Sequence, residues 1–330
     1  MSESYYLFSN GTLSRKDNVF RLKTPTGEFK DLKIEVARDI YVFGELTLNT
    51  KCLNYMGQLN IPTHFFNYYG FYTGSFYPKE TKVSGALLVK QVEALLDENK
   101  KMMLAQEFIV GGAHNILRNL KYYNNRDKDL SETISNIEFL VKEIKKTKSV
   151  QELMGIEGNI RKLYYDSWNK IFNKEVEFEK RVKRPPDNMV NCLISFINTL
   201  VYTATLSEIY KTQLNPTISY LHVPGEKRFS LCLDISEIFK PLISDRMIFS
   251  LINKNIITED DFDKESNFCY LKPKAKMKIL KEFDERMKTT IKHRDLNRNT
   301  SYRHLLRLEC YKLIKTIVED VQYNSFKMWW

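Results

Sequence analysis

The sequence predicts an α+β protein, with a small β-rich N-terminal domain followed by a larger, mainly α-helical domain. Over residues 1–80, short aromatic and β-branched runs alternate with turn residues. After Pro78, residues 84–330 consist mostly of long segments with apolar residues three and four apart, which is typical of amphipathic helices. The chain has 330 residues, 43% of them apolar, so it can bury a sizeable core. We expect a short linker at 79–84.

Turn residues divide the N-terminal domain. Asn10-Gly11 stands between apolar runs at 5–8 and 19–22, and Asn-Gly in that position is a strong hairpin signal. Thr24-Pro25-Thr26-Gly27 predicts the next turn. Helical spacing of Leu53, Met56 and Leu59 predicts a helix over 50–59. Further strands are expected at 40–43, 63–66 and 71–73.

The second domain shows helical periodicity at 87–103, 191–206 and 302–321, and a polar loop is expected at 121–131. We find no internal repeat and no low-complexity segment. No apolar run looks long enough to cross a bilayer, and the start, MSESYYLFSNG, lacks the order of a signal peptide. A soluble, cytoplasmic protein is therefore expected.

Cysteine usage and charge narrow the class of protein. Five scattered cysteines without a CxxC pair argue against a disulfide framework and against structural zinc, and favour a reducing compartment. The net charge of +10 favours a polyanionic partner, most often nucleic acid. There is no Walker A loop, HExxH, GxSxG or GxGxxG, so nucleotide, peptidase and hydrolase classes lack support.

Glu157 is the first unusual residue. On a helix it falls inside an apolar stripe that includes Leu153, Ile160 and Tyr164, where a carboxylate is costly unless it is paired, protonated or metal-bound. Neighbouring Gly155 and Gly158 each lower helix propensity by roughly 1 kcal/mol, and close approach of a backbone or a ligand would account for them. The alternative is a Glu that pairs with a core Arg.

A histidine and an acidic pair follow. His222 lies at or near a loop, between Asn215-Pro216 and Pro224-Gly225. Asp234 and Glu237, three residues apart, share one side of a helix. Taken alone, His222 fits a hydrogen-bonded structural histidine and the acidic pair fits a solvated helix face. Together, one imidazole and two or three carboxylates suit octahedral Mg²⁺ or Mn²⁺, and such an ion can polarise a phosphodiester.

The order of these elements resembles one family along almost the whole chain. The matching segments are Asp39-Ile-Tyr-Val-Phe-Gly, the Glu157 helix, Arg184-Pro-Pro-Asp-Asn-Met-Val-Asn191, Leu214-Asn-Pro, Tyr220-Leu-His222, Arg228-Phe-Ser-Leu-Cys-Leu-Asp234-Ile-Ser-Glu237-Ile-Phe-Lys-Pro, Asp245-Arg246 and Arg307-Leu-Glu-Cys-Tyr-Lys-Leu-Ile. Each segment is loose by itself, but the ordered set is specific. In this respect the chain resembles the CRISPR-associated integrases, the first-numbered Cas proteins, which are the catalytic subunits of the spacer-acquisition complex.

The resemblance implies a metal site and a reaction. Glu157, His222 and Glu237 correspond to the metal ligands of the family, and Asp234 to an additional acidic position. Glu237 stands where many relatives have Asp, and Lys240 replaces the usual Arg before Pro241, which gives phosphate a point charge in place of a fork. The implied reaction is transesterification, in which the 3′-hydroxyl of a prespacer DNA attacks the leader–repeat junction and a second attack follows on the other strand of the repeat.

The resemblance also implies partners: a homodimer with contacts from the β domains, and a small partner, the second-numbered Cas protein. Expected DNA contacts near the acidic site are Lys240, Arg184, Arg228 and Arg246, helped by basic residues in 272–281 and 294–303. Two other functions stay open: a branched-DNA repair nuclease that uses water as the nucleophile, and a non-catalytic DNA-binding scaffold.

Overall fold

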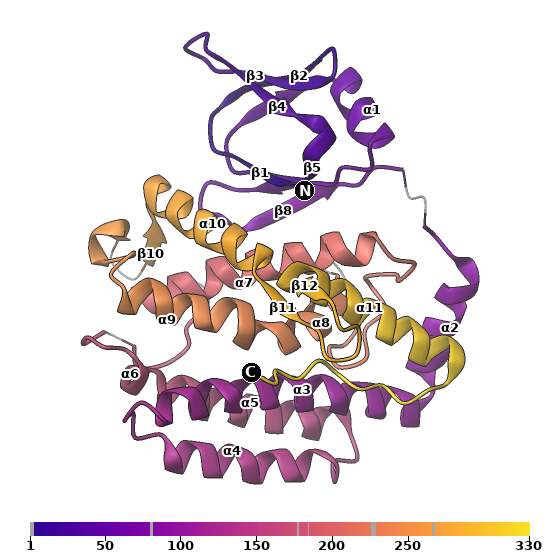
Figure 1. The fold of residues 1–330 in the computed structure, drawn as a ribbon, viewed down its shortest axis with the longest axis vertical. Coiled ribbons are helices and arrows are strands. Elements are labelled where there is room, and N and C mark those ends of the chain that lie inside the picture. The colour runs from indigo at the N-terminus through magenta and orange to yellow at the C-terminus, as the bar shows by residue number, and fades with distance from the viewer. Residues whose placement is uncertain (1–2, 80–81, 177, 184, 226–228, 266–267) are drawn as a thin grey trace. The chain divides into compact units, whose positions relative to one another are not determined.

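The computed structural model describes residues 3–79, 82–176, 178–183, 185–225, 229–265 and 268–330. The chain divides into two compact units, Met1–Thr81 and Lys82–Trp330 (Figure 1). The first unit is β-rich and the second is helical, which confirms the predicted fold class.

The first unit is built from two four-stranded sheets. One sheet has the order β1-β5-β7-β8, with β1, β5 and β7 parallel, and the other has the order β4-β3-β2-β6. The elements are β1 (Glu3–Leu7), β2 (Gly11–Lys16), β3 (Val19–Lys23), β4 (Phe29–Lys33), a 3₁₀ turn (Ile34–Val36), β5 (Ala37–Val42), β6 (Leu46–Leu48), α1 (Thr50–Gln58), β7 (Thr63–Phe66) and β8 (Tyr72–Phe76).

The expected Asn10-Gly11 hairpin is wrong. The strands on either side, β1 and β2, belong to different sheets, and the hairpin joins β2 to β3 across Asp17, whose φ is +50°. Gly11 instead allows the backbone of Lys23 to lie close to its own backbone. Its φ is +148°, and a Cβ there would lie 2.1 Å from the carbonyl oxygen of Lys23. The Gly27 turn is confirmed, with Gly27 N–H donating to Thr24 at 3.0 Å.

One apolar core joins both sheets to α1. Strand residues that alternate along the chain, such as Ile40 and Val42, point into it because successive strand side chains face opposite sides. The buried members are Leu7, Leu13, Phe20, Leu22, Leu32, Ile34, Ile40, Val42, Cys52, Met56 and Ile61.

The second unit contains most of the helices, and their sequence determines where several begin. Ser84, Asp97, Ser149, Asn188 and Ser301 each accept a backbone N–H in the first turn of the helix that follows. The elements are α2 (Gly85–Leu96), α3 (Glu98–Asn124), α4 (Ser131–Ile144), α5 (Val150–Asp166), α6 (Trp168–Ile171), α7 (Met189–Tyr210), α8 (Ser230–Lys240), a π-helical turn (Pro241–Asp245), α9 (Arg246–Asn253), a 3₁₀ turn (Glu259–Asp261), β9 (Phe262–Glu265), β10 (Phe268–Leu271), α10 (Pro273–Lys288), β11 (Thr290–Lys292), β12 (Asn299–Ser301) and α11 (Tyr302–Glu319).

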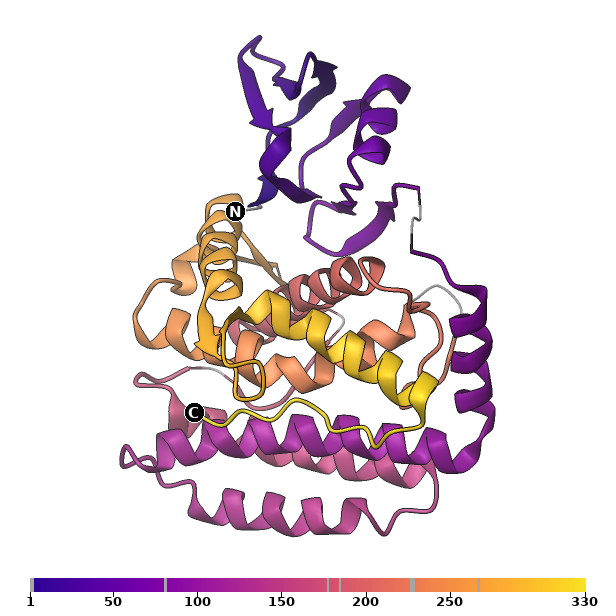
Figure 2. The same ribbon diagram turned by 45° about the vertical axis from the view of Figure 1, so that its right-hand side comes forward.

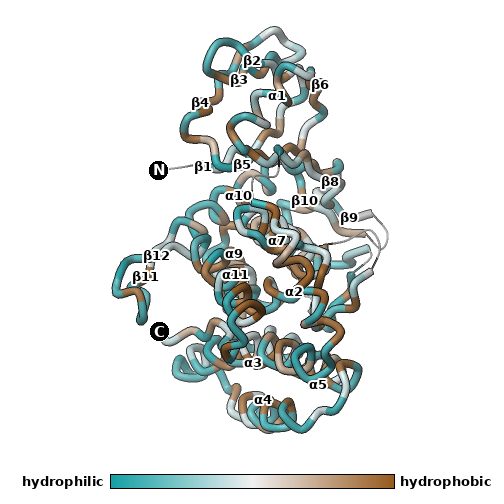
Figure 3. The backbone as a smooth tube through the Cα atoms, turned by 90° about the vertical axis from the view of Figure 1, so that its right-hand side faces the viewer, coloured by the Kyte–Doolittle hydropathy of each residue, from teal (hydrophilic) through white to brown (hydrophobic). Residues whose placement is uncertain are grey.

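Helices α3, α4 and α5 run side by side, and the extended C-terminal segment after α11 follows α3 (Figure 2). Hydrophobic and hydrophilic stretches alternate along these helices, as the apolar spacing in the sequence predicts (Figure 3).

Helix α7 departs from the expectation that no apolar run could span a bilayer. Among the described residues it alone has the length and composition to do so, but 78% of its most apolar window is buried inside the protein. That burial is characteristic of a core helix.

Helix α8 ends in an irregular turn that α3 supports. Pro241 has no N–H for the carbonyl of Glu237, four residues earlier, and the chain passes into the π turn. Side-chain amides of α3 bind carbonyls there: Asn115 donates to Ile238 at 2.8 Å and Asn119 to Pro241 at 2.9 Å. These bonds fix the end of α8 against α3.

Candidate active site

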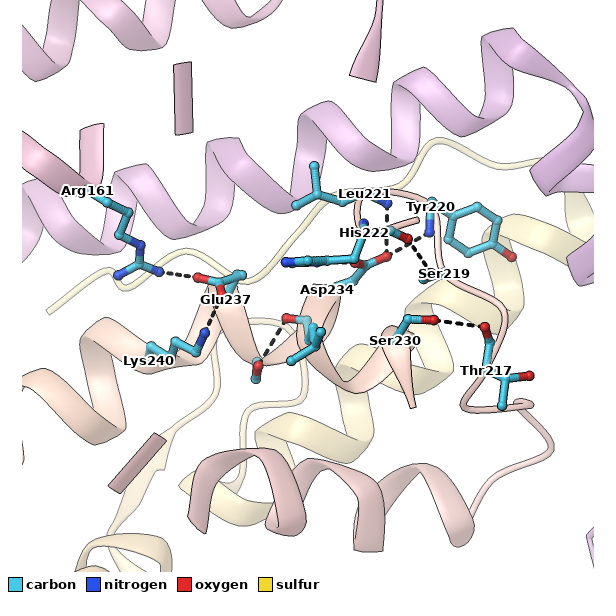
Figure 4. Close-up of polar contacts among 12 residues, drawn as sticks. Arg161, Thr217, Ser219, Tyr220, Leu221, His222, Ser230, Asp234, Glu237 and Lys240 are labelled. Atoms are coloured by element: carbon cyan, nitrogen blue, oxygen red, sulfur yellow. Dashed lines mark hydrogen bonds and ion pairs between the residues drawn. The ribbon is translucent and has the colours of Figure 1, made fainter. Parts of the chain in front are cut away.

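The candidate site forms where α5, α8 and the loop at 219–222 meet. Glu157 lies on α5, Asp234 and Glu237 lie one turn apart on α8, and His222 ends the loop segment. Figure 4 shows the imidazole of His222 beside Asp234 and directed toward Glu237. The predicted residues therefore come from three separate parts of the chain.

Asp234 holds the histidine in place. Its fully buried carboxylate accepts the backbone N–H groups of Tyr220 (2.7 Å), Leu221 (3.0 Å) and His222 (3.0 Å), and lies 2.8 Å from His222 Nδ1. Both oxygens of Asp234 already accept backbone N–H groups, so Nδ1 is the donor in the contact with Oδ1, and Nε2 is left to present its lone pair. This is the arrangement in which a second carboxylate orients a histidine ligand. Asp234 is thus a positioning residue.

Arg161 joins the other two acids. Its Nε donates to Glu157 at 3.2 Å and its Nη2 contacts Glu237, which also pairs with Lys240. The expected alternative, a Glu157 paired with a core Arg, is therefore present in this structure. It does not isolate Glu157, because the same guanidinium brings Glu157 and Glu237 to one place.

Burial and neighbouring charges shift the pKa values of two acids in the site. Burial raises the pKa of Glu237, but Lys240 and Arg161 outweigh it and hold that pKa well below its usual range. Burial raises the pKa of Asp245 to about 7, against the attraction of Arg161 and Lys240. Glu157, Glu237 and His222 keep 23%, 13% and 20% of their side chains exposed. A small pocket, lined partly by Glu157, Arg161 and Glu237, opens at the two acids.

Within the described part of the chain, no three His, Cys, Asp or Glu side chains are arranged as metal ligands. The physical reason is visible in the contacts: Arg161 and Lys240 occupy the carboxylate oxygens, and Asp234 takes one nitrogen of His222. The assignment of Glu157, His222 and Glu237 as ligands stays a prediction.

Some of the residues expected to contact DNA are exposed, and others contact protein groups. Lys240 contacts Glu237, and Arg246, which is half-buried, donates to Asn119 at 2.7 Å. Arg184 and Arg228 lie outside the described residues. In 272–281, Lys274 and Lys281 are exposed. The remaining lysines of that segment are partly or fully engaged: Lys276 is buried, and Lys272 and Lys278 bind acidic residues.

The sequence analysis did not identify two residues of the candidate site, Arg161 and Asp245. Arg161 is four residues after Glu157 on a predicted helix, so the spacing of an ion pair was available. Asp245 lies between the apolar runs Leu242-Ile243 and Met247-Ile248-Phe249, and a carboxylate among apolar residues is the signal that singled out Glu157. The space beside Gly155 and Gly158 is open, so no backbone approach explains them.

A β-rich unit followed by a helical unit that presents a loop histidine and carboxylates from separate helices defines a class of α+β proteins with an acidic candidate site. Within that class the chain belongs to the Cas1 family, since the family model "CRISPR associated protein Cas1" matches residues 5–285. The resemblance inferred from the ordered segments is confirmed.

Close relatives match along their full length. The chain is 58% identical to the "CRISPR-associated endonuclease Cas1" of Fusobacterium nucleatum, covering 100% of this chain and 98% of the relative. It is 47% identical to the protein of that name from Clostridium perfringens, covering all of both.

Solved structures of similar fold support the family assignment. A CAS1 protein from Thermotoga maritima aligns with a TM-score of 0.87 and 39% identity, covering 98% of this chain and 100% of that chain. A casposase bound to integration product has the same TM-score at 19% identity, covering 98% and 93%, and shares the fold.

Proposed function

We propose that the chain is a metal-dependent DNA integrase that inserts prespacer DNA into a CRISPR array. In the proposed reaction, a prespacer 3′-hydroxyl attacks the phosphodiester at the leader–repeat junction, and a second attack follows on the other strand. The observation that carries the proposal is the pairing of two features: Asp234 fixes His222 beside Glu237, and Arg161 draws Glu157 to the same place.

The donor set fits Mg²⁺ or Mn²⁺. Glu157, His222 and Glu237 would hold the ion, since two carboxylates and one imidazole leave positions for water and phosphate oxygens. All three side chains are partly exposed, so water and phosphate oxygens could reach an ion held between them. When bound, such an ion stabilises charge on the attacked phosphate.

The chain's own residues have separable roles in this proposal. Asp234 keeps the Nδ1 proton on His222, so that Nε2 is available as a ligand. Lys240 and Arg161 place positive charge beside the acids, where a phosphate would otherwise be repelled. Burial raises the pKa of nearby Tyr165 to about 12, so this phenol stays neutral and does not add to the negative charge.

The proposed partners follow from the family. We expect double-stranded and branched DNA, a homodimer with contacts from the β-rich unit, and the small Cas2 protein. Solved relatives of the same fold include a "Cas6-RT-Cas1--Cas2 complex". A cytoplasmic location is consistent with five buried free cysteines.

A second candidate is hydrolysis of branched DNA, because the relatives carry the name endonuclease. The same residues serve both reactions, and the nucleophile alone differs: water releases a product, whereas a DNA 3′-hydroxyl leaves it joined to the target. The fold itself is compatible with joining, because the casposase with this fold was solved with an integration product.

Strand transfer by site variants tests the proposal. Glu157→Ala and His222→Ala should each reduce joined product by more than roughly 100-fold, about 3 kcal/mol of transition-state stabilisation, with DNA affinity little changed. Glu138→Ala is the matched control, because Glu138 is an exposed carboxylate that pairs with Lys121, away from the candidate site. Near-native joining by Glu157→Ala would refute the mechanism, and activity lost only in step with melting would return Glu157 to a structural role.

A further inference from the structure

Arg161 has more carboxyl neighbours than it binds. Nε and Nη2 contact Glu157 and Glu237, while Nη1 lies 4.0 Å from Oδ2 of Asp245. Neither Nη1 nor Asp245 Oδ2 has a hydrogen-bond partner within the described residues, although both are buried. Leaving both atoms of such a pair unsatisfied is costly. A normal hydrogen bond of about 2.9 Å would need a shift of only about 1 Å.

Arg161 contacts the carboxylates of Glu157 and Glu237, and the proposed cation would bind these same two groups. A divalent ion and a guanidinium cannot occupy the same oxygens of Glu157 and Glu237, and at a few ångströms they repel each other. The alternative anion for Arg161 lies on the π turn, where Pro241–Asp245 follows the last residue of α8. Asp245 therefore sits within reach of Arg161, and it is not among the residues that line the pocket at the two acids.

We propose that Arg161 is an exchangeable counter-ion of this site: its guanidinium bridges Glu157 and Glu237 without a divalent cation, and moves onto Asp245 when a cation takes those carboxylates. This inference rests on the proposed metal site. It assigns Arg161 and Asp245 as positioning residues that set cation affinity, because the ion must displace one ion-pair partner and Asp245 accepts the displaced group.

The two residues should act in opposite directions on cation affinity. Arg161→Gln removes the cation that competes with Mn²⁺ for the two acids, so it should tighten Mn²⁺ binding by about threefold or more. In chelator, the same variant should have a lower melting temperature, because Glu157 and Glu237 lose the guanidinium that pairs with them. Removing the receptor with Asp245→Asn should weaken Mn²⁺ binding by about threefold or more, because displaced Arg161 has no anion to pair with. A merely structural role would weaken binding in both variants.

Titration calorimetry of the full chain with Mn²⁺, and melting with and without the ion, provide readouts independent of strand transfer. Arg161→Lys covers the case in which the Gln variant does not fold: an ammonium lacks the planar fork of the guanidinium and holds the two acids together less well, so the Mn²⁺ affinity of this variant should also exceed the native one. Arg307→Gln is the control, because Arg307 pairs with buried Glu208 between α11 and α7; it should lower the melting temperature and leave Mn²⁺ affinity unchanged.

The outcomes separate the two hypotheses. Unaltered Mn²⁺ affinity in Glu157→Gln would refute the metal site itself. If Glu157→Gln loses Mn²⁺ but Arg161→Gln or Arg161→Lys binds it no more tightly than the native chain, the exchange is refuted and the metal site stands. Unchanged affinity in Asp245→Asn would likewise refute the exchange.

Discussion

At the scale of single residues, Asp245 is a buried carboxyl group whose proton depends on folding. Its pKa is about 7 in the folded chain because burial disfavours the charged form, compared with 3.8 for a free carboxyl. Between those values the folded chain holds a proton that the unfolded chain has released. The free energy of unfolding therefore falls as pH rises from about 4 to 7.

Asp245→Asn should remove this pH dependence in the metal-free protein. Asparagine has no proton to lose, so the stability of the variant relative to the native chain should increase between pH 5 and pH 8 by at least about 1 kcal/mol. Urea unfolding in chelator at both pH values measures it. Asp129→Asn, at an 89% exposed side chain, should show no such change. An equal stability difference at both pH values would mean that Asp245 does not titrate between pH 5 and pH 8.

At the scale of elements, α3 connects the end of α8 to the C-terminal segment. Besides its bond to Ile238, Asn115 donates to the carbonyl of Phe326 at 3.3 Å and accepts from the N–H of Met328 at 2.7 Å. Gly111 leaves room for that segment, since a Cβ there would lie 2.6 Å from Ser325 Oγ. One asparagine thus satisfies three backbone groups from two other elements.

Asn115→Ala should therefore destabilise the chain by about 2–4 kcal/mol, because buried backbone groups lose their partners at about 1–3 kcal/mol each and relax in part. Urea unfolding gives the value. Asn99→Ala, exposed near the start of the same helix, should change stability by less than about 0.5 kcal/mol. A loss below about 1 kcal/mol in Asn115→Ala would show that water replaces the amide.

At the scale of the whole molecule, the net charge of +10 governs encounters with DNA. Several of the basic residues contact protein carboxylates, whereas Lys274 and Lys281 are exposed on α10. Phosphate contacts release counterions, so each one adds about 0.9 to the steepness with which duplex affinity falls with salt.

DNA affinity should fall steeply as salt rises, and the double variant Lys274→Gln/Lys281→Gln should reduce the slope of log affinity against log salt by about 1 to 2. Fluorescence anisotropy across a salt series measures both slopes. Lys90→Gln, an exposed lysine paired with Glu93, is the control and should leave the slope unchanged. Affinity that is flat between low and moderate salt would contradict the electrostatic account.

The sequence by itself determined the fold class and the family, and it singled out four residues of the candidate site. Aromatic and β-branched runs before Pro78 and helical spacing after it are local patterns, and a carboxylate inside an apolar stripe is visible wherever the helix period is read. Hence Glu157, His222, Asp234 and Glu237 could be singled out before their neighbours were known.

Only the tertiary structure decided what those residues touch. Strand partners depend on distant segments, so Asn10-Gly11 looked like a hairpin although β1 pairs with β5. Arg161, which bridges Glu157 to Glu237, contacts a residue 76 positions away in sequence, and Asp234 contacts His222 across 12 positions. Side-chain contacts between separate elements are set by packing of the whole unit, which no local period in the sequence encodes.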